Sequence, residues 1–265
     1  MPKLARWAAA LALAACAAAA ENNRLTPQEQ AAGWQLLFDG RTMNGWVDPA
    51  GKSPPGDAFT VEDGCIKVRA KPRIHEELFT TAVFGDFELA FDWRISPRGN
   101  SGVKYRIQDN VFLLHEKVKR FEDLVELSLK RRPPRGERGQ DYVIGFEYQV
   151  IDNRGHRDAL RGARQQAGAL YNLVGPPEDV ARQPGEWNQG RILLRGNHVE
   201  HWLNGRKVVD VMLDAPEIAA GLARRWGEGT RVYELLTRQP RRQCPISLQN
   251  HNDEAWFRNI KIRPL

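Results

Sequence analysis

Cysteine is scarce in this sequence, and the cysteines that occur do not form a metal-binding pattern. Cys16, Cys65 and Cys244 lie far apart, whereas structural zinc sites use closely spaced pairs of cysteines or histidines. The sequence therefore does not indicate a zinc-binding module. Export from the cytoplasm would allow Cys65 and Cys244 to form a disulfide, but the sequence does not show whether their Cβ atoms meet.

Patterns that define other large classes of protein are also missing. No stripe of basic and aromatic residues is present that could follow a nucleic-acid backbone, so we expect no nucleic-acid partner. No Asp-x-Asp-x-Asp run indicates a calcium-binding loop. Hydrophobic residues make up 42% of the chain and charged residues 27%, which is typical of a globular protein and argues against general disorder.

A pronounced apolar run lies at the N-terminus. Lys3 and Arg6 precede an apolar run that extends from Trp7 to Ala15. This run is too short to cross a bilayer comfortably. Positive charge, an apolar run and small residues in this order are typical of a secretory signal. The segment Leu13–Cys16 resembles the lipobox of bacterial lipoproteins, in which the cysteine is lipidated.

We therefore predict a lipoprotein signal peptide over residues 1–15, followed by a lipidated Cys16, a tether and a short helix over residues 16–32. Lipid chains would anchor the protein to a membrane. Ala17 follows the cysteine, which by resemblance to lipoprotein sorting favours the periplasmic side of the outer membrane. The alternative is an ordinary signal that is cleaved near Ala20, with loss of the cysteine.

Residues 33–265 show the patterns of antiparallel strands. The segment Phe87–Ile95 alternates apolar and polar residues, as expected for a strand with one buried face. Residues 190–212 predict a three-stranded meander, with turns at Gly196-Asn197 and Asn204-Gly205. No alternation of strands and helices indicates a parallel sheet, so we predict one all-β domain, a sandwich or barrel.

A few further elements are predicted with this domain. Thr26–Glu29 carries the capping-box pattern of a helix start. Apolar spacing predicts a helix over Val118–Leu129, within a long insertion, and the start pattern Asp214-x-x-Glu217 predicts a second helix that extends to Trp226. The segments Ile246–Gln249 and Trp256–Ile262 predict a closing hairpin.

Several motifs together resemble one family, the domain of unknown function 1080, also called the 3-keto-disaccharide hydrolase or 3-keto-glucoside lyase/hydratase domain. They occur in the family's order, and each is weak alone. In chain order they are Gly33–Gly40 with Gly45-Trp46, Phe87–Leu89 with Asp92–Arg94, Gly99–Val103 with Tyr105-Arg106, Glu147–Asp152, Ala167–Tyr171, Gly185–Asn188, Val199–Gly205, Leu248–His251 and Trp256–Ile260.

The resemblance implies an all-β fold, a concanavalin A-like jelly roll of two antiparallel sheets, with short helical insertions. It also implies an enzyme that cleaves or hydrates 3-keto-glycosides. A separate oxidoreductase makes these sugars, so we expect no nicotinamide cofactor. Two departures from the family pattern put the substrate in doubt: Asn250 stands where aspartate is more common, and the insertion over residues 110–142 is long.

The chemistry of a 3-keto sugar defines which residues to seek. The ketone at C3 acidifies the proton on C2, so a base can remove that proton and the group on C1 can leave. This route needs a base, an acid and donors for the enolate oxygen. With the family resemblance, we predict Glu147 and His251 as the acid and base and Arg106 as the group that holds the oxygen. A divalent cation bound through His251 is an alternative.

Other polar and aromatic residues are predicted to bind the sugar. Each has a structural alternative: a turn for the asparagine and aspartate that flank strands, an ion pair for charged residues, or the core for tryptophan. His201 and Trp202 point to opposite faces of one strand, and we expect Trp202 to be the buried one, so that His201 faces the groove or solvent. The predicted substrate-binding residues are Asp92, Arg94, Asn100, Gln149, Asp152, Trp187, His201 and Gln249.

Two other functions remain open from the sequence. The first is a carbohydrate-binding module without catalysis, which would depend on exposed aromatic residues such as Trp187 or Trp46. The second is an envelope interaction domain that uses the basic insertion around Val118–Pro134 as its partner surface.

Overall fold

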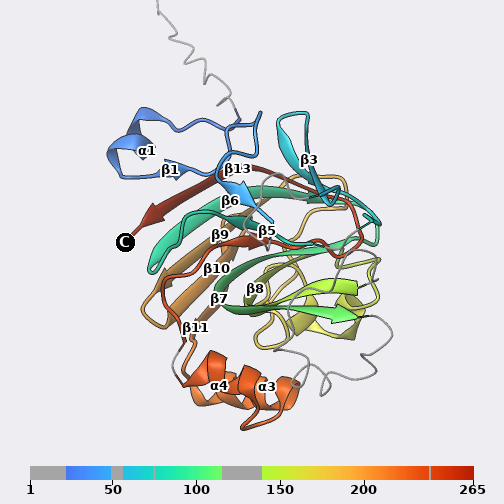
Figure 1. The fold of residues 1–265 in the computed structure, drawn as a ribbon, viewed down its shortest axis with the longest axis vertical. Helices are drawn as coiled ribbons and strands as arrows, with labels where there is room; N and C mark the ends of the chain where they lie inside the picture. The colour runs from blue at the N-terminus through green and yellow to red at the C-terminus, as the bar shows by residue number, and fades with distance from the viewer. Residues whose placement is uncertain (1–21, 49–55, 74–75, 115–138, 239) are drawn as a thin grey trace, which may run out of the picture.

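The structure is a computed structural model that describes residues 22–48, 56–73, 76–114, 139–238 and 240–265 (Figure 1). The predicted signal peptide, Cys16 and the predicted helix Val118–Leu129 lie outside these residues. Among the described residues, no helix combines the length and the apolar character that a membrane span requires.

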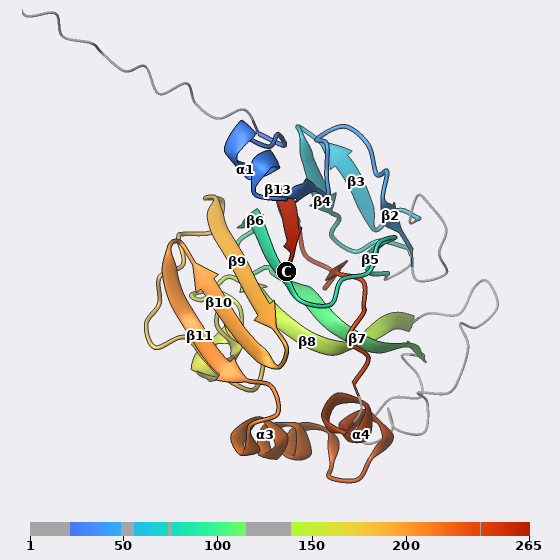
Figure 2. The same cartoon turned by 90° about the vertical axis from the view of Figure 1, so that its left-hand side faces the viewer.

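Two antiparallel sheets face each other and form a sandwich (Figures 1 and 2). The prediction of an all-β jelly roll with short helical insertions is confirmed. The larger sheet has the order β11 (Arg206–Met212), β10 (His198–Leu203), β9 (Asn188–Arg195), β6 (Phe87–Ile95), β13 (Ala255–Pro264), β4 (Cys65–Val68) and β3 (Phe59–Glu62), and β1 (Gln35–Leu36) also pairs with β13. The smaller sheet has the order β2 (Trp46–Val47), β5 (Leu78–Thr80), β12 (Ser247–Leu248), β7 (Asn100–Leu114) and β8 (Gly139–Ile151).

Alternation along the strands places the core between the sheets. The apolar residues of β6 point inward as predicted, and Phe91 meets Tyr148 of β8 edge-to-face with 5.3 Å between ring centroids. The meander over residues 190–212 is also confirmed as β9, β10 and β11. Strand β7 pairs with β8 over most of its length, with an irregularity between Tyr105 and Asp109, and both strands bend strongly (Figure 2).

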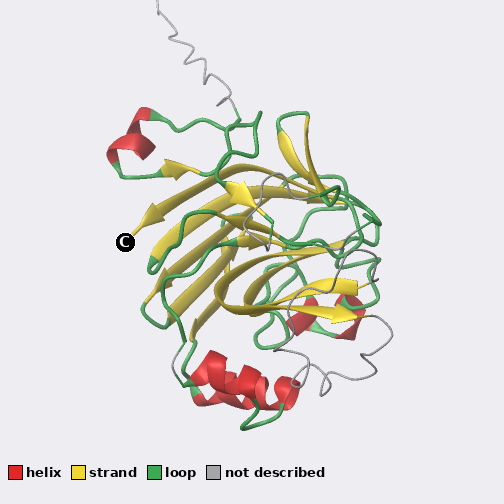
Figure 3. Ribbon diagram, in the orientation of Figure 1, coloured by secondary structure: helices red, strands yellow, loops and turns green. Residues whose placement is uncertain are grey.

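Short helices lie at the ends and edges of the sandwich (Figure 3). Helix α1 (Pro27–Ala31) begins with the predicted capping box. Helix α3 (Pro216–Trp226) packs beside α4 (Arg231–Thr237), and its N-cap is Ala215 rather than the expected Asp214. Two short 3-10 helices, η1 (Ala159–Arg161) and η2 (Ala163–Gln165), follow β8.

The N-terminal segment is attached to the sandwich before α1. Asn23 is buried, and its backbone N–H donates to Oδ1 of Asn259 on β13 at 2.6 Å. The Asn259 N–H in turn donates to Oδ1 of Asn23 at 2.8 Å. The predicted tether and short helix over residues 16–32 are therefore docked on the larger sheet at least from Asn23 onward.

The predicted closing hairpin is wrong. Strand β12 lies in the smaller sheet between β5 and β7, whereas β13 lies in the larger sheet between β6 and β4. The chain crosses from one sheet to the other between Leu248 and Ala255. Both segments have an apolar inner face, so their sequence pattern does not distinguish a hairpin within one sheet from a crossover between two sheets.

The expected orientation of His201 and Trp202 is also wrong. His201 is fully buried, where Nδ1 donates to the Gly168 carbonyl at 3.0 Å and Nε2 accepts from the Tyr105 hydroxyl at 2.9 Å. These partners satisfy both ring nitrogens, so the imidazole can replace an apolar side chain in the core. Trp202 points outward, where the Arg191 guanidinium lies 4.6 Å and the Lys207 ammonium 5.8 Å from its ring centroid.

The two described cysteines are free and buried. Cys65 lies on β4 and Cys244 lies just before β12, so they belong to regions of different sheets. They form no disulfide in this structure, a point that the sequence left open.

We predict that His201→Gln makes the stability of the protein less sensitive to acid. Burial lowers the pKa of His201 to about 4, so the unfolded chain takes up a proton between pH 6.5 and 4 that the folded chain does not. Wild-type stability from this residue is therefore present above pH 6.5 and lost as the pH falls. Urea unfolding at pH 7.5 and pH 4.5 should show the stability gap between wild type and variant shrinking by up to roughly 3 kcal/mol. A gap that is the same at both pH values would contradict the neutral, buried state.

Candidate active site

The face of the smaller sheet that points away from the core carries a row of polar side chains. On β8, Tyr148 and Val150 are fully buried in the core, so Glu147 and Gln149 share the opposite face, as the sequence predicted. Lys104 on β7 lies directly opposite Glu147 in the register of the two strands. Glu147 is 8% exposed and Lys104 is 3% exposed, so this row is largely withdrawn from water.

A buried ion pair anchors one end of the row. The Lys104 ammonium donates to Oε1 of Glu77 at 2.5 Å, and the Ser247 hydroxyl donates to Oε2 of the same carboxylate at 2.7 Å. Burial alone would lower the pKa of Lys104, but the Glu77 and Glu147 carboxylates raise it above its ordinary value. The lysine is therefore a fixed positive charge within this row.

The Glu147 side chain lies flat over β7 because Gly102 has no side chain there. A Cβ atom at Gly102 would come within 2.5 Å of Oε1 of Glu147. With its amide nitrogen toward Glu147, an orientation assigned from its partners, Gln149 donates to Oε1 at 3.2 Å and to the Ser101 carbonyl at 3.0 Å. The glycine and the glutamine together determine where the carboxylate lies.

Glu147 is poised to exchange a proton near neutral pH. Burial raises its pKa to about 7, and the positive charges of Lys104 and Arg225 limit that rise. Among the described residues, neither cation forms an ion pair with Glu147. A carboxylate that is half ionised at pH 7 and is not bound to a cation is suited to general acid–base catalysis.

Residues that follow β8 and residues of α3 surround this carboxylate. The Tyr171 backbone N–H donates to the Glu147 carbonyl at 3.0 Å, and the Tyr171 hydroxyl donates to Asp158 at 2.6 Å. Arg225 of α3 donates to the Tyr142 hydroxyl at 2.7 Å and lies 4.9 Å from the Tyr171 ring centroid. The helical insertion thus reaches the polar face of the sheet.

His251 belongs to the same neighbourhood as Glu147. The backbone N–H of Gln249, two residues before His251, donates to the Gly102 carbonyl at 2.9 Å, and the Glu147 carboxylate lies against Gly102. Desolvation of the ring lowers the pKa of His251 and the neighbouring His156 lowers it further, although the residue as a whole is exposed to solvent. The ring of His156 meets His251 edge-to-face at 6.2 Å. His251 is therefore neutral near pH 7 and can accept or relay a proton.

His156, His251 and Asp253 are the described residues at this face that could hold a divalent cation. One ligand atom from each lies within 4.8 Å of the others. However, Nδ1 of His156 accepts a hydrogen bond from the Asp158 N–H at 3.0 Å, so the neutral ring carries its proton on Nε2. To bind a metal, His156 would have to lose either the hydrogen bond to Nδ1 or the proton on Nε2.

Asn250, which departs from the family pattern, has a structural role in this chain. Its amide nitrogen donates to the carbonyls of Ala58 and Arg69 at 3.2 and 3.1 Å, and its oxygen accepts from the Asn252 N–H at 2.9 Å. An aspartate could not donate to these two carbonyls. The asparagine thus ties the loop that carries His251 to the segments that contain Ala58 and Arg69.

Two predicted binding residues on the same face have unsatisfied oxygen atoms. Oδ1 of Asn100 and Oε1 of Gln249 are buried and accept no hydrogen bond. Such atoms are costly unless a ligand or water supplies a donor. Asp152, by contrast, accepts from the backbone N–H groups of Arg98 and Arg154 at 2.8 and 2.9 Å, so its carboxylate closes a turn.

Arg106, predicted to hold the oxygen, lies apart from Glu147 and His251. Its guanidinium donates to the Gly196 carbonyl at 2.7 Å and lies 3.5 Å from Asp86. It lines a separate cavity of about 200 Å³. The strand irregularity after Tyr105 gives Arg106 a φ of +50° and removes it from the alternation on which the prediction relied.

Asp92, Arg94 and Trp187 lie on the outer face of the larger sheet, on the other side of the sandwich from Glu147. Arg94 lies 5.0 Å from the Trp187 ring centroid, and Arg258 lies 3.9 Å from it. Asp92 accepts from Asn259 at 2.7 Å. These residues therefore stack and pair with one another on a surface remote from the polar row of the smaller sheet.

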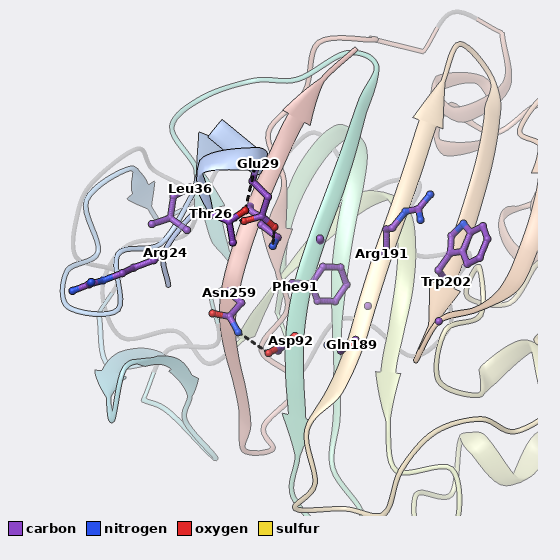
Figure 4. Close-up of a pocket in the computed structure, with 14 residues that line it drawn as sticks. Arg24, Thr26, Glu29, Leu36, Phe91, Asp92, Gln189, Arg191, Trp202 and Asn259 are labelled. Carbon is purple, nitrogen blue, oxygen red and sulfur yellow. Dashed lines mark hydrogen bonds and ion pairs between the residues drawn. The ribbon is translucent and has the colours of Figure 1, made fainter. Parts of the chain in front are cut away.

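A groove of about 360 Å³ runs along this outer face (Figure 4). Trp202 and Arg191 line one side, α1 lines the other, and Asp92 lies between them. Its charges are already paired: Glu29 with Lys261, and Arg191 with Glu88. We therefore place the candidate active site on the smaller sheet, where Glu147 and unsatisfied polar atoms gather.

Comparison with known proteins identifies the family. The model of the 3-keto-alpha-glucoside-1,2-lyase-like domain matches residues 33–263. The chain belongs to this family. The match spans both sheets, α3 and α4, and it confirms the resemblance found in the sequence motifs.

Relatives of known structure or activity agree with this membership. The chain is 30% identical to a 3-keto-disaccharide hydrolase of Bacteroides thetaiotaomicron strain VPI-5482, over 93% of this chain and 83% of the relative. A crystal structure of a candidate glycosyl hydrolase from Parabacteroides distasonis ATCC 8503 has a TM-score of 0.70 and 26% identity, over 92% of this chain and 100% of that chain. A second one from the same organism, at 22% identity and a TM-score of 0.58, supports the fold.

Sequence reasoning missed several residues of this family member's site. Lys104 could have been found, because it has the same strand parity as Gly102 and lies one strand away from Glu147. His156 belongs to none of the motifs identified in the sequence, and its ring packs against His251. Arg225 lies on a helix whose approach to the sheet no local pattern predicts.

We predict that Glu147→Gln stabilises the protein at alkaline pH. The buried carboxyl of Glu147 has a pKa of about 7, above its ordinary 4.5, so folding becomes less favourable as the pH rises between these values. Glutamine removes this effect. The variant should unfold at a higher temperature than wild type at pH 8, by up to roughly 3 kcal/mol in stability, and the two should converge at pH 4. Equal gaps at both pH values would show that Glu147 has an ordinary pKa.

Proposed function

We propose that this protein cleaves 3-keto-glycosides, and that Glu147 removes the proton on C2 of the keto sugar. Family membership supports an enzyme of 3-keto sugars. The observation that carries the mechanism is the buried Glu147 carboxylate, which lies beside two positive charges without an ion pair to either. A base with a pKa near the working pH is the group that this reaction needs.

The proposed reaction is an elimination followed by addition of water. Glu147 takes the C2 proton, the electron pair of that C–H bond forms a C2–C3 double bond, and the C3 carbonyl becomes an enolate. The bond between C1 and the glycosidic oxygen then breaks, the carbonyl re-forms, and the leaving oxygen takes up a proton. Water adds across the C1–C2 double bond. The sum is hydrolysis, without an oxidant or a reductant.

The other residues of the face have supporting roles in this proposal. His251, neutral near pH 7, relays the proton that the leaving oxygen takes up and that water gives back. The free oxygens of Asn100 and Gln249 accept hydrogen bonds from sugar hydroxyls. Lys104 keeps Glu147 ionised for part of the time at neutral pH, because a nearby positive charge favours the carboxylate.

The cellular setting is proposed from the sequence alone. We infer export through residues 1–15, lipidation at Cys16, and a position on the periplasmic side of the outer membrane. A separate oxidoreductase that forms the 3-keto group would supply the substrate.

A carbohydrate-binding module remains the competing function. Trp187 lies on an outer surface beside Arg94 and Arg258, which is the observation that favours it. Trp46 cannot serve as a stacking platform, because it is buried and its indole N–H donates to the Leu37 carbonyl at 2.7 Å. An interaction surface around Val118–Pro134 falls outside the described residues.

Turnover of a 3-keto-disaccharide separates these functions. We expect the purified protein to release monosaccharide, Glu147→Gln to lose at least about 100-fold in kcat, and His251→Ala to lose a comparable factor. Both variants should keep the wild-type circular dichroism spectrum. As a matched control, His198→Ala, on the outer face of the larger sheet, should retain full activity.

The outcomes distinguish enzyme from binding module. If the wild type binds the sugar and releases no product, and if Trp187→Ala abolishes binding while Glu147→Gln does not, the module is supported and the mechanism fails. If the wild type turns over but both Glu147→Gln and His251→Ala remain fully active, the enzyme acts through other residues.

Gly102→Ala tests the position of the carboxylate rather than its chemistry. The added methyl group would collide with Glu147, whose flexible side chain must then move off β7. Because small displacements of a catalytic group are costly, we expect kcat to fall about 100-fold with little change in melting temperature. Unchanged kcat would mean that the observed position of Glu147 is not the working one.

A further inference from the structure

Arg225 is a cation with unused hydrogen-bonding capacity at the candidate active site. Its Nη2 donates to the Tyr142 hydroxyl, while Nε is buried and has no partner. The guanidinium lies between aromatic rings, 4.9 Å from the Tyr171 centroid and 5.0 Å from the Trp226 centroid. These contacts hold the group in one orientation without satisfying its donors.

Arg225 reaches the face that carries Glu147 through Tyr142. The ring of Tyr142 lies 5.5 Å from the Lys104 ammonium, and Lys104 lies directly opposite Glu147 in the strand register. Burial alone would lower the pKa of Arg225, but Tyr142, Tyr171 and Glu147 raise it above its ordinary value. The two charged groups attract each other and form no ion pair among the described contacts. An anionic or carbonyl oxygen of a ligand could therefore bind beside Glu147 and receive the free donors of Arg225.

We propose that Arg225, carried by α3, holds the C3 oxygen of the keto sugar and stabilises the enolate that Glu147 generates. This inference rests on the proposed function. It gives Arg225 the part that the sequence assigned to Arg106, whose donors are directed at Gly196 and Asp86.

The electron flow explains why a fixed guanidinium is needed there. When Glu147 takes the C2 proton, the C–H electron pair forms the C2–C3 double bond, and the carbonyl pair moves onto the C3 oxygen. That oxygen gains a negative charge, which a preorganised donor of opposite charge stabilises more than it stabilises the neutral ketone. When the C1–O bond breaks, the charge leaves the C3 oxygen and the ketone re-forms.

The test compares four variants with the 3-keto-disaccharide as substrate. Arg225→Gln should lower kcat about 100- to 1,000-fold with a much smaller change in KM. Arg225→Lys should recover only part of the loss, because an ammonium lacks the planar fork. Arg224→Gln, which removes the exposed neighbouring arginine, should be unchanged. Tyr142→Phe removes the hydrogen bond that holds Arg225 but keeps the charge, and should lose less than tenfold.

A pH profile separates a direct role from a structural one. Among the described residues, the charges of Lys104 and Arg225 lower the pKa of Glu147, and those of Glu77 and Asp158 raise it. Loss of the Arg225 charge should raise the pKa of Glu147, so the rising limb of kcat/KM should shift to higher pH in Arg225→Gln. Arg225→Gln with kcat within threefold of wild type, or with an unmoved limb, would overturn the proposal.

A second probe keeps the two proposals distinguishable. Gluconate presents an anionic oxygen on a ligand of glucose size. Calorimetry should show at least tenfold weaker binding of gluconate to Arg225→Gln than to wild type, with Arg224→Gln unchanged. If the wild type fails to turn over a 3-keto-disaccharide, the proposed function fails; equal gluconate binding by wild type and Arg225→Gln would overturn the role of Arg225 as an anion site.

Discussion

The ion pair between Lys104 and Glu77 sets the electrostatics on which the candidate site depends. It buries an ammonium group within the polar row of the smaller sheet and occupies it with a partner other than Glu147. Glu147 therefore experiences a positive charge without forming a salt bridge, and its pKa comes to about 7 instead of a low value. If Lys104 bound Glu147 directly, the carboxylate would be held in its ionised form and would be a weaker base.

The rest of the fold shields this face from solvent in part and adds polar and charged side chains to those of the sheet. Gly102 lets Glu147 lie against β7, and the segment after β8 brings Tyr171 and Asp158 over it. Helix α3 contributes Arg225 from outside the sheet. A two-sheet sandwich thus brings a carboxyl with a raised pKa, a partly unpaired guanidinium and free polar acceptors together on one face.

Local patterns in the sequence predicted the elements well and their assembly less well. The alternation around Phe91 and Tyr148 predicted which face of each strand is buried, and it correctly placed Glu147 and Gln149 together. Parity failed for Arg106, because an irregular strand changes which way a residue points. It failed for His201, because hydrogen-bond partners distant in sequence decide whether a histidine can be buried.

The crossover between β12 and β13 and the approach of Arg225 to Glu147 could not be predicted in the same way. Both depend on which segments pack together in space, and neither leaves a periodic trace.

The proposed mechanism depends above all on Glu147 as the base that removes the proton on C2. The most direct test is the kinetic isotope effect on kcat/KM with substrate deuterated at C2. A primary isotope effect, together with exchange of the C2 label into solvent that Glu147→Gln abolishes, is the result that we expect. A wild-type enzyme that cleaves the deuterated and ordinary sugars at the same rate, with the label fully retained at C2, would contradict it.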